Sequence, residues 1–217
     1  MLRLVTTALF ALAFSSAALA GDDGFVRIFD GSSPSGWLIG QDKPLPAKNV
    51  QSDGLNPHGS GGYVVFHEKR YGDYVFDFDY KLTRHCNSGV FVRVGSMDDP
   101  VMTGLEVALD DTRGHGRHDP GAFYDLVPPR VNAQKPIGQW NHMTITAKGP
   151  RIDVVLNGEA VSSINLDAFT EPGKRPDGSR HKFEGVRIKD FNRPGYVGFQ
   201  DHGSDCWFKN VKIKEMK

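Results

Sequence analysis

The stretch YVFDFDYKL at residues 74–82 decides the fold class. Its large apolar side chains occupy every second position, and the intervening positions include Asp77, Asp79 and Lys81. A period of two is typical of a half-buried β-strand, because successive side chains of a strand point to opposite faces of its sheet. The stretch therefore predicts a strand with one face in a core and the other toward solvent.

The same alternation recurs along the chain, and no long stretch has the spacing of an amphipathic helix. Further strands are expected near residues 25–29, 63–67, 88–95, 103–111, 122–126, 140–147, 151–156, 160–166, 196–200 and 207–214. Asn157-Gly158 predicts a tight hairpin between two of them. The 25 Gly and 13 Pro, placed between short strands, favour an all-β protein, a two-sheet antiparallel jelly-roll sandwich. Residues 110–120 and 168–185 are expected to be polar loops.

The first twenty residues predict an exported protein. Arg3 precedes an apolar stretch that is too short to span a membrane, and Ala18-Leu19-Ala20 forms an A-x-A cleavage site. These features indicate a signal peptide over residues 1–20, cleaved near Ala20, with a periplasmic or secreted mature protein. Residues 21–217 are long enough for one domain with its own core and short for two.

The charge balance argues against one class of partner, and the cysteine count leaves two redox states open. The chain has 26 basic and 26 acidic residues, and removing Arg3 leaves 25 against 26. This balance argues against a nucleic-acid partner, and no second apolar run approaches membrane length. Cys86 and Cys206 are an even pair, so the sequence leaves open both a disulfide and two buried free thiols.

Alternation also sorts side chains by face, and it places several polar groups opposite the core face of their strands. The set consists of a fixed cation, two carboxylates and an imidazole, whereas an ordinary solvated surface carries repetitive charges. Arg and carboxylates can bind sugar hydroxyls, and carboxylates or His can transfer protons. A solvated outer face is the competing interpretation. The residues predicted to share this face are Arg93, Glu106, Asp110, Gln200 and His202.

An ordered series of short motifs resembles a family first described as a domain of unknown function and now called the 3-keto-disaccharide hydrolases. The series comprises FDG at 29–31 with GW at 36–37, YGDY at 71–74, NSGVFVR at 87–93, GLEV at 104–107 with Asp110, GAFY at 121–124, GQWN at 138–141, LNG at 156–158, GFQDHG at 198–203 and FKNV at 208–211. Lys209 stands where the family usually has Arg, and the two cysteines are not part of the pattern.

The resemblance implies a concanavalin A-like jelly roll and cleavage of glycosides already oxidised at C3 of the sugar. A ketone at C3 acidifies the C2 proton, so a base can form an enediolate. The anomeric leaving group then departs, and water adds at C1. The small carbohydrate substrate would come from a separate sugar oxidoreductase, because no nucleotide-binding glycine pattern occurs in this chain.

Face and motif together give each candidate residue a role. His202 is the first candidate for proton transfer, because its ordinary pKa lies near neutrality, and Glu106 is the competing base. Arg93 would stabilise the enediolate or hold a pair of sugar hydroxyls. Asn87, Asp110, Gln200 and Asp201 are assigned to substrate binding, although Asp201 should face away from His202 in a regular strand. Trp140 would stack on a sugar ring, unless it packs structurally.

The sequence allows more than one metal content and more than one class of function. His115 and His118 have a spacing that a metal site can use, but they lie in a loop, so no metal ligand is assigned and a divalent cation remains an alternative. The same fold also hosts non-catalytic carbohydrate-binding modules and adhesion domains. Glu106, Asp110 and His202 favour catalysis, since a lectin-like module needs only aromatic rings and amides.

Overall fold

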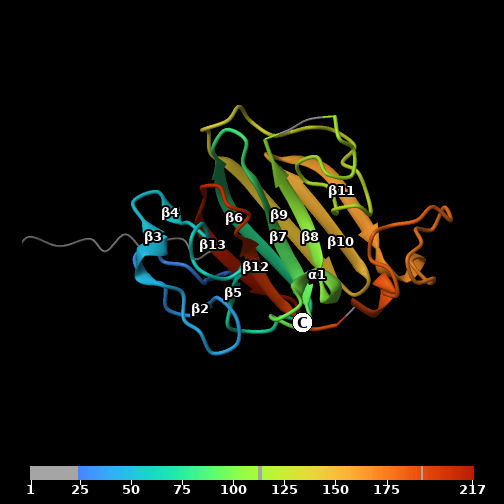
Figure 1. Cartoon of the computed structure of the whole chain (residues 1–217), viewed down its shortest axis with the longest axis horizontal. Coiled ribbons are helices and arrows are strands. Elements are labelled where there is room, and N and C mark those ends of the chain that lie inside the picture. Colours follow the sequence, from blue (N-terminus) through green and yellow to red (C-terminus); the bar gives the residue numbers. More distant parts are fainter. Residues whose placement is uncertain (1–23, 112–113, 192) are drawn as a thin grey trace, which may run out of the picture.

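The computed structural model describes residues 24–111, 114–191 and 193–217 as a mostly β structure (Figure 1). Two antiparallel sheets form its two layers. Sheet A has the strand order β11-β10-β9-β6-β13-β4-β3, with β1 also paired to β13, and sheet B has the order β2-β5-β12-β7-β8. The prediction of a two-sheet antiparallel sandwich is confirmed. The predicted signal peptide lies outside the described residues.

The strands of sheet A are β1 (Val26–Arg27), β3 (Val50–Gln51), β4 (Gly54–Leu55), β6 (Tyr74–Leu82), β9 (Asn141–Lys148), β10 (Arg151–Leu156), β11 (Glu159–Asn165) and β13 (Cys206–Glu215). Those of sheet B are β2 (Trp37–Leu38), β5 (Val64–His67), β7 (Asn87–Val94), β8 (Leu105–Asp110) and β12 (Tyr196–Gln200). The helical turns are η1 (Ala47–Asn49), α1 (Pro100–Thr103), η2 (Leu166–Ala168) and η3 (Ile188–Phe191). None of the helices in the described ranges is long or apolar enough to cross a membrane.

The alternation of β6 works as expected. Its aromatic residues have no exposed surface and belong to the core between the sheets. On the opposite face, Asp77 and Asp79 contact the imidazole of His142, at 3.2 Å and 2.8 Å respectively. Burying one large apolar side chain stabilises the fold by about 1.5–3 kcal/mol relative to leaving it in water. The outward carboxylates fix which face of the strand is the core face.

Aromatic stacking joins the two sheets across this core. The ring of Phe199 from β12 stacks on Phe208 from β13 with centroids 3.7 Å apart, and on Trp37 from β2 at 5.4 Å. Phe78 from β6 meets the Phe199 ring edge-on at 5.4 Å. Phe199 therefore contacts both layers, and its inward direction sets the direction of its neighbours on β12.

Turn geometry explains why the predicted hairpin forms and why one predicted strand does not. Asn157 and Gly158 both have positive φ angles, 52° and 88°, as a tight turn between β10 and β11 requires. The strand expected at residues 122–126 is wrong, because the backbone of Phe123 hydrogen-bonds Val127 and closes a turn after an isolated bridge to β8. The strand expected at residues 25–29 shortens to β1.

Replacing Phe199 by Ala should lower the free energy of unfolding by about 3–5 kcal/mol, because the cavity would remove contacts from both sheets at once. The control is Val26→Ala, at a side chain that is 64% exposed, with an expected change within about 0.5 kcal/mol. Urea unfolding followed by tryptophan fluorescence measures both. A loss below 1 kcal/mol for Phe199→Ala would contradict the role given to this ring.

Candidate active site

The outer face of sheet B carries the candidate site. Phe199 points into the core, so the next residue of β12, Gln200, points outward. On β8, Val107 and Leu109 are core residues, so Glu106 and Asp110 point outward as well. Alternation therefore predicted correctly that these three polar residues share a face.

A glycine on the neighbouring strand makes room for Glu106. A Cβ atom at Gly89 of β7 would lie 2.6 Å from Cγ of Glu106 and 2.7 Å from its Oε1. The Glu106 side chain therefore lies across β7 at this position, flat against the sheet. Asn87, two residues earlier on β7, pairs with Asp110 of β8, so both lie at the end of this face.

Burial changes the acidity of Glu106. Removal from water raises the pKa of its carboxyl from 4.5 to about 7, and the ammonium of Lys182 opposes the rise. Its charge also helps to raise the pKa values of Tyr63 and Tyr124, so both phenols are close enough to interact with it. A carboxyl with a pKa near neutrality can accept or donate a proton at ordinary pH. Glu106 is therefore the candidate for a general base on this face.

Tyr63 and Gln200 form one side of the site. Nε2 of Gln200 donates a hydrogen bond of 2.6 Å to the Tyr63 hydroxyl. The Gln200 side chain is 3% exposed, and its buried Oε1 has no hydrogen-bond partner among the described residues. A buried acceptor without a partner is costly unless a ligand supplies a donor. The Gln200 oxygen is thus a candidate acceptor for a sugar hydroxyl.

The other side of the site is built by two loops. Nζ of Lys182 lies 3.7 Å from the ring centroid of Tyr124, and the imidazole of His118 stacks on the same ring with centroids 4.5 Å apart. Asp125 holds the Lys182 backbone through a 2.7 Å hydrogen bond and pairs with Arg175 at 2.8 Å. These contacts fix Lys182, the cation that interacts with Glu106.

His202 follows β12 in an exposed turn. Its ring centroid lies 6.5 Å from that of Tyr63 at an interplanar angle of 60°. The turn is held by Asp201, whose carboxylate accepts backbone hydrogen bonds from Gly59 at 2.8 Å and Gly203 at 3.0 Å. His202 is therefore beside the site, whereas the Asp201 carboxylate is engaged in positioning the turn.

The prediction that Arg93 shares this face is wrong. Arg93 has a left-handed φ of 57°, and the β7–β12 register shifts beside it, so its side chain turns inward. It is 1% exposed and pairs with Asp73 at 3.0 Å. Its guanidinium also donates to the carbonyls of Gly149 and Arg193. Arg93 is a structural cation that joins loops at the far end of β7.

Trp140 is likewise away from the site. It precedes β9 of sheet A, and its ring contacts the ammonium groups of Lys209 at 3.8 Å and Lys81 at 5.1 Å. Lys81 also lies 4.8 Å from the Trp207 ring, so the two tryptophans belong to one aromatic and cationic surface on sheet A. The structure therefore does not bring Trp140 together with Glu106, Asp110 and Gln200, with which it was predicted to serve the substrate.

The loop that suggested a metal site has another internal structure. The Asp119 carboxylate accepts hydrogen bonds from the backbone N–H groups of Gly114, His115 and Gly116. The His118 ring is used in the stack on Tyr124. Among the described residues, no group of three or more His, Cys, Asp or Glu side chains is placed to hold a metal ion.

Sequence reasoning missed Tyr63, Tyr124 and Lys182. Tyr63 opens the predicted 63–67 strand but lies just before the observed β5, and no role was assigned to it. Lys182 lies in the predicted 168–185 loop, where alternation assigns no direction to a side chain. Tyr124 ends the GAFY motif, which was a usable signal.

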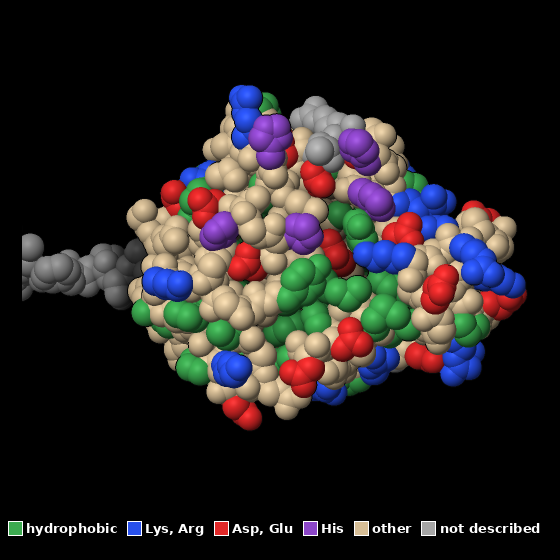
Figure 2. Space-filling view, in the orientation of Figure 1, with side chains coloured by type: hydrophobic (Ala, Val, Ile, Leu, Met, Phe, Trp, Pro, Cys, Tyr) green, Lys and Arg blue, Asp and Glu red, His purple; other side chains and the backbone are tan. Residues whose placement is uncertain are grey.

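In Figure 2 an apolar area over β7 and β12 is bordered by acidic, basic and histidine side chains.

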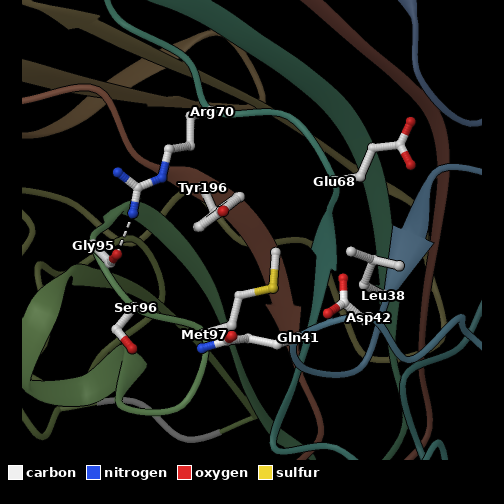
Figure 3. A pocket seen from close by; sticks show the side chains of 9 residues that line it. All are labelled: Leu38, Gln41, Asp42, Glu68, Arg70, Gly95, Ser96, Met97 and Tyr196. Atoms are coloured by element: carbon white, nitrogen blue, oxygen red, sulfur yellow. Dashed lines mark hydrogen bonds between the residues drawn. The ribbon is translucent and has the colours of Figure 1, made fainter.

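A separate cavity of about 570 Å³ opens at the other end of the same sheet (Figure 3). There the guanidinium of Arg70 lies 4.8 Å from the ring centroid of Tyr196 and donates to the carbonyl of Gly95. None of the sequence-predicted site residues lines this cavity. The candidate active site is instead the face around Glu106, where a titratable carboxyl, a cation and a buried acceptor without a partner among the described residues come together.

Comparison with known proteins identifies the family. The family model described as a 3-keto-alpha-glucoside-1,2-lyase-like domain matches residues 24–214. The chain belongs to this family. The resemblance read from the ordered motifs is therefore confirmed, and Glu106, Tyr124 and Gln200 all lie within the matched range.

Individual relatives agree with this family. A 3-keto-disaccharide hydrolase from Bacteroides thetaiotaomicron is 27% identical over 88% of this chain and 78% of that protein. A crystal structure of a proposed glycosyl hydrolase from Parabacteroides distasonis is 28% identical, with a TM-score of 0.68 over 83% of this chain and 99% of that one. A second from the same organism is 23% identical, with a TM-score of 0.73 over 90% and 95% of the two chains, and supports the fold.

The Glu106 carboxyl should make stability pH-dependent in a defined direction. Its folded pKa of about 7 exceeds its ordinary value of 4.5, so the folded state binds more protons between these values. The free energy of unfolding of the wild type, measured relative to Glu106→Gln, should therefore fall by about 3 kcal/mol as pH rises from 4.5 to 8. Urea unfolding across this range measures it.

The control for this titration is Glu159→Gln, at an exposed glutamate on β11. Its difference from the wild type should stay within about 0.5 kcal/mol at every pH. A flat difference for Glu106→Gln as well would show that the Glu106 carboxyl is not shielded from water enough to raise its pKa.

Proposed function

We propose that this protein is a carbohydrate-active enzyme that cleaves 3-keto-glycosides by removing the C2 proton, eliminating the anomeric group and hydrating C1. The observation that carries the proposal is the Glu106 carboxyl, whose pKa is about 7 and whose charge interacts with one cation and two phenols. A base with this pKa suits a C–H bond acidified by an adjacent ketone, because about half of it is ionised at neutral pH.

Glu106 acts as the base in this proposal. Its carboxylate takes the proton from C2, and the electron pair of the C2–H bond moves to the C3 oxygen as the enediolate forms. Lys182 is the cation whose charge interacts with the Glu106 carboxylate. It therefore takes the role of stabilising the enediolate charge that was first predicted for Arg93. The enediolate electrons then expel the group at C1. Addition of water across the resulting C1–C2 double bond restores a 3-keto sugar.

The remaining residues bind and protonate the substrate. His202 is exposed beside Tyr63, where it can donate a proton to the departing glycosidic oxygen. Oε1 of Gln200 accepts a hydrogen bond from a sugar hydroxyl, and Tyr63 holds the Gln200 amide in that orientation. Asn87 and Asp110, paired at the end of the strands, contact the polar rim of the sugar.

The chemistry implies a partner reaction and a compartment. A C3 ketone is absent from ordinary glycosides, so a sugar oxidoreductase must supply the substrate. Residues 1–20 direct the chain out of the cytoplasm in this proposal, and the enzyme works in the periplasm or outside the cell.

Substrate specificity tests the proposal. Residues 21–217 should release free sugar from a 3-keto-disaccharide and none from the unoxidised parent disaccharide, because only the ketone acidifies C2. Adding a chelator to the same assay asks whether a divalent cation takes part. Binding of both sugars without cleavage of either would overturn the enzymatic proposal and favour a carbohydrate-binding module.

The pH profile and two variants test the residue roles. Since Glu106 must be ionised, kcat/KM should rise with pH through about 7. Glu106→Gln should lower kcat by at least about 100-fold, and His202→Ala should lower it by about 10- to 100-fold, more for poor leaving groups. The matched control is His142→Ala on sheet A, with activity unchanged. Full turnover by Glu106→Gln would exclude Glu106 as the base.

A further inference from the structure

The two cysteines of the chain meet inside the fold. Cys86 and Cys206 are each 1% exposed and belong to the same core cluster, where burial and then the neighbouring Cys86 raise the pKa of the Cys206 thiol. They are 120 positions apart in the sequence (206 minus 86), so only the fold brings them together. Cys206 begins β13 of sheet A, and Cys86 immediately precedes β7 of sheet B. The contact therefore lies where the chain passes between the sheets.

Backbone hydrogen bonds hold both cysteines in place. Cys86 donates to the carbonyl of Thr83 at 3.3 Å, which closes the turn between β6 and β7. Thr83 in turn donates to the Asp205 carbonyl, from its amide at 3.4 Å and its hydroxyl at 3.0 Å. Cys206 pairs with Leu82 across the two strands. The turn that carries Cys86 is thus tied to Asp205 and, through Leu82, to Cys206 itself.

We propose that Cys86 and Cys206 form a disulfide when the protein meets a thiol–disulfide oxidant, and that this bond braces the end of sheet B where the candidate site lies. One cysteine thiolate attacks the disulfide of the oxidant, releases one oxidant thiol and forms a mixed disulfide. The second cysteine displaces the other oxidant thiol. The two cysteines lose two protons and two electrons, and the oxidant disulfide becomes two thiols.

The cross-link would act on the candidate site through two short connections. The carbonyl of Cys86 accepts a 3.0 Å hydrogen bond from the amide of Asp111, and the next residue, Asn87, pairs with Asp110. On the other side, Cys206 follows the turn that carries His202 by four positions. A covalent bond between the cysteines would limit separation of these two edges of the site.

Burial determines when the bond forms. Removal from water raises the pKa of the Cys206 thiol, so little reactive thiolate exists in the folded protein. Both thiols are also hidden from a large oxidant. Oxidation should therefore be slow in the native state and fast during folding, when both cysteines are accessible.

The test compares reduced and oxidised forms of one sequence. Residues 21–217 are unfolded in denaturant, refolded with either dithiothreitol or oxidised and reduced glutathione, and then alkylated with iodoacetamide in denaturant. The expected glutathione product is a monomer lighter than the reduced chain by two hydrogen atoms, with no alkylated cysteine and one peptide linking Cys86 to Cys206. The dithiothreitol product should carry two labels.

Thermal unfolding of the same two products measures the bracing. Closing a loop of this length should raise the Tm by about 10 °C relative to the reduced form. Cys86→Ser, which keeps a single thiol, is the control, and its Tm should not differ between the two refolding conditions. Two labelled cysteines after glutathione refolding would overturn the cross-link, and an unchanged Tm would overturn the bracing.

Discussion

The inward packing of Phe199 is the contact on which the rest of the structure depends. Its ring stacks on Phe208 of sheet A and on Trp37 of sheet B, so it joins the two layers. Because side chains alternate along a strand, fixing Phe199 in the core places Gln200 on the outer face. The apolar contact that stabilises the sandwich therefore also determines the direction of a polar residue at the site.

The site itself opposes stability. Glu106 lies against β7 where a glycine gives it room, and the loss of water raises its pKa to about 7. A carboxyl in this environment is costly when ionised, and proteins keep such groups where function needs a base near neutral pH. Lys182 offsets part of the cost and would be positioned to take developing negative charge in the proposed reaction.

Alternation allowed the fold and part of the site to be predicted from sequence. It correctly placed Glu106, Asp110 and Gln200 on one face, because each follows a regular strand pattern. It failed at Arg93, where a left-handed residue reverses the pattern, and no local sequence signal marks that bulge. Lys182 could not be found this way, since loop contacts set its position.

In the proposed function, a sugar binds on the outer face of sheet B over Glu106. The most direct measurement is a crystal structure of Glu106→Gln soaked with a 3-keto-disaccharide, which this variant should bind without turning it over. Density for the keto sugar is expected against residue 106, with C2 nearest its side chain and a hydroxyl on Oε1 of Gln200. Sugar bound only beside Arg70 and Tyr196, or only on the Trp140 surface of sheet A, would contradict it.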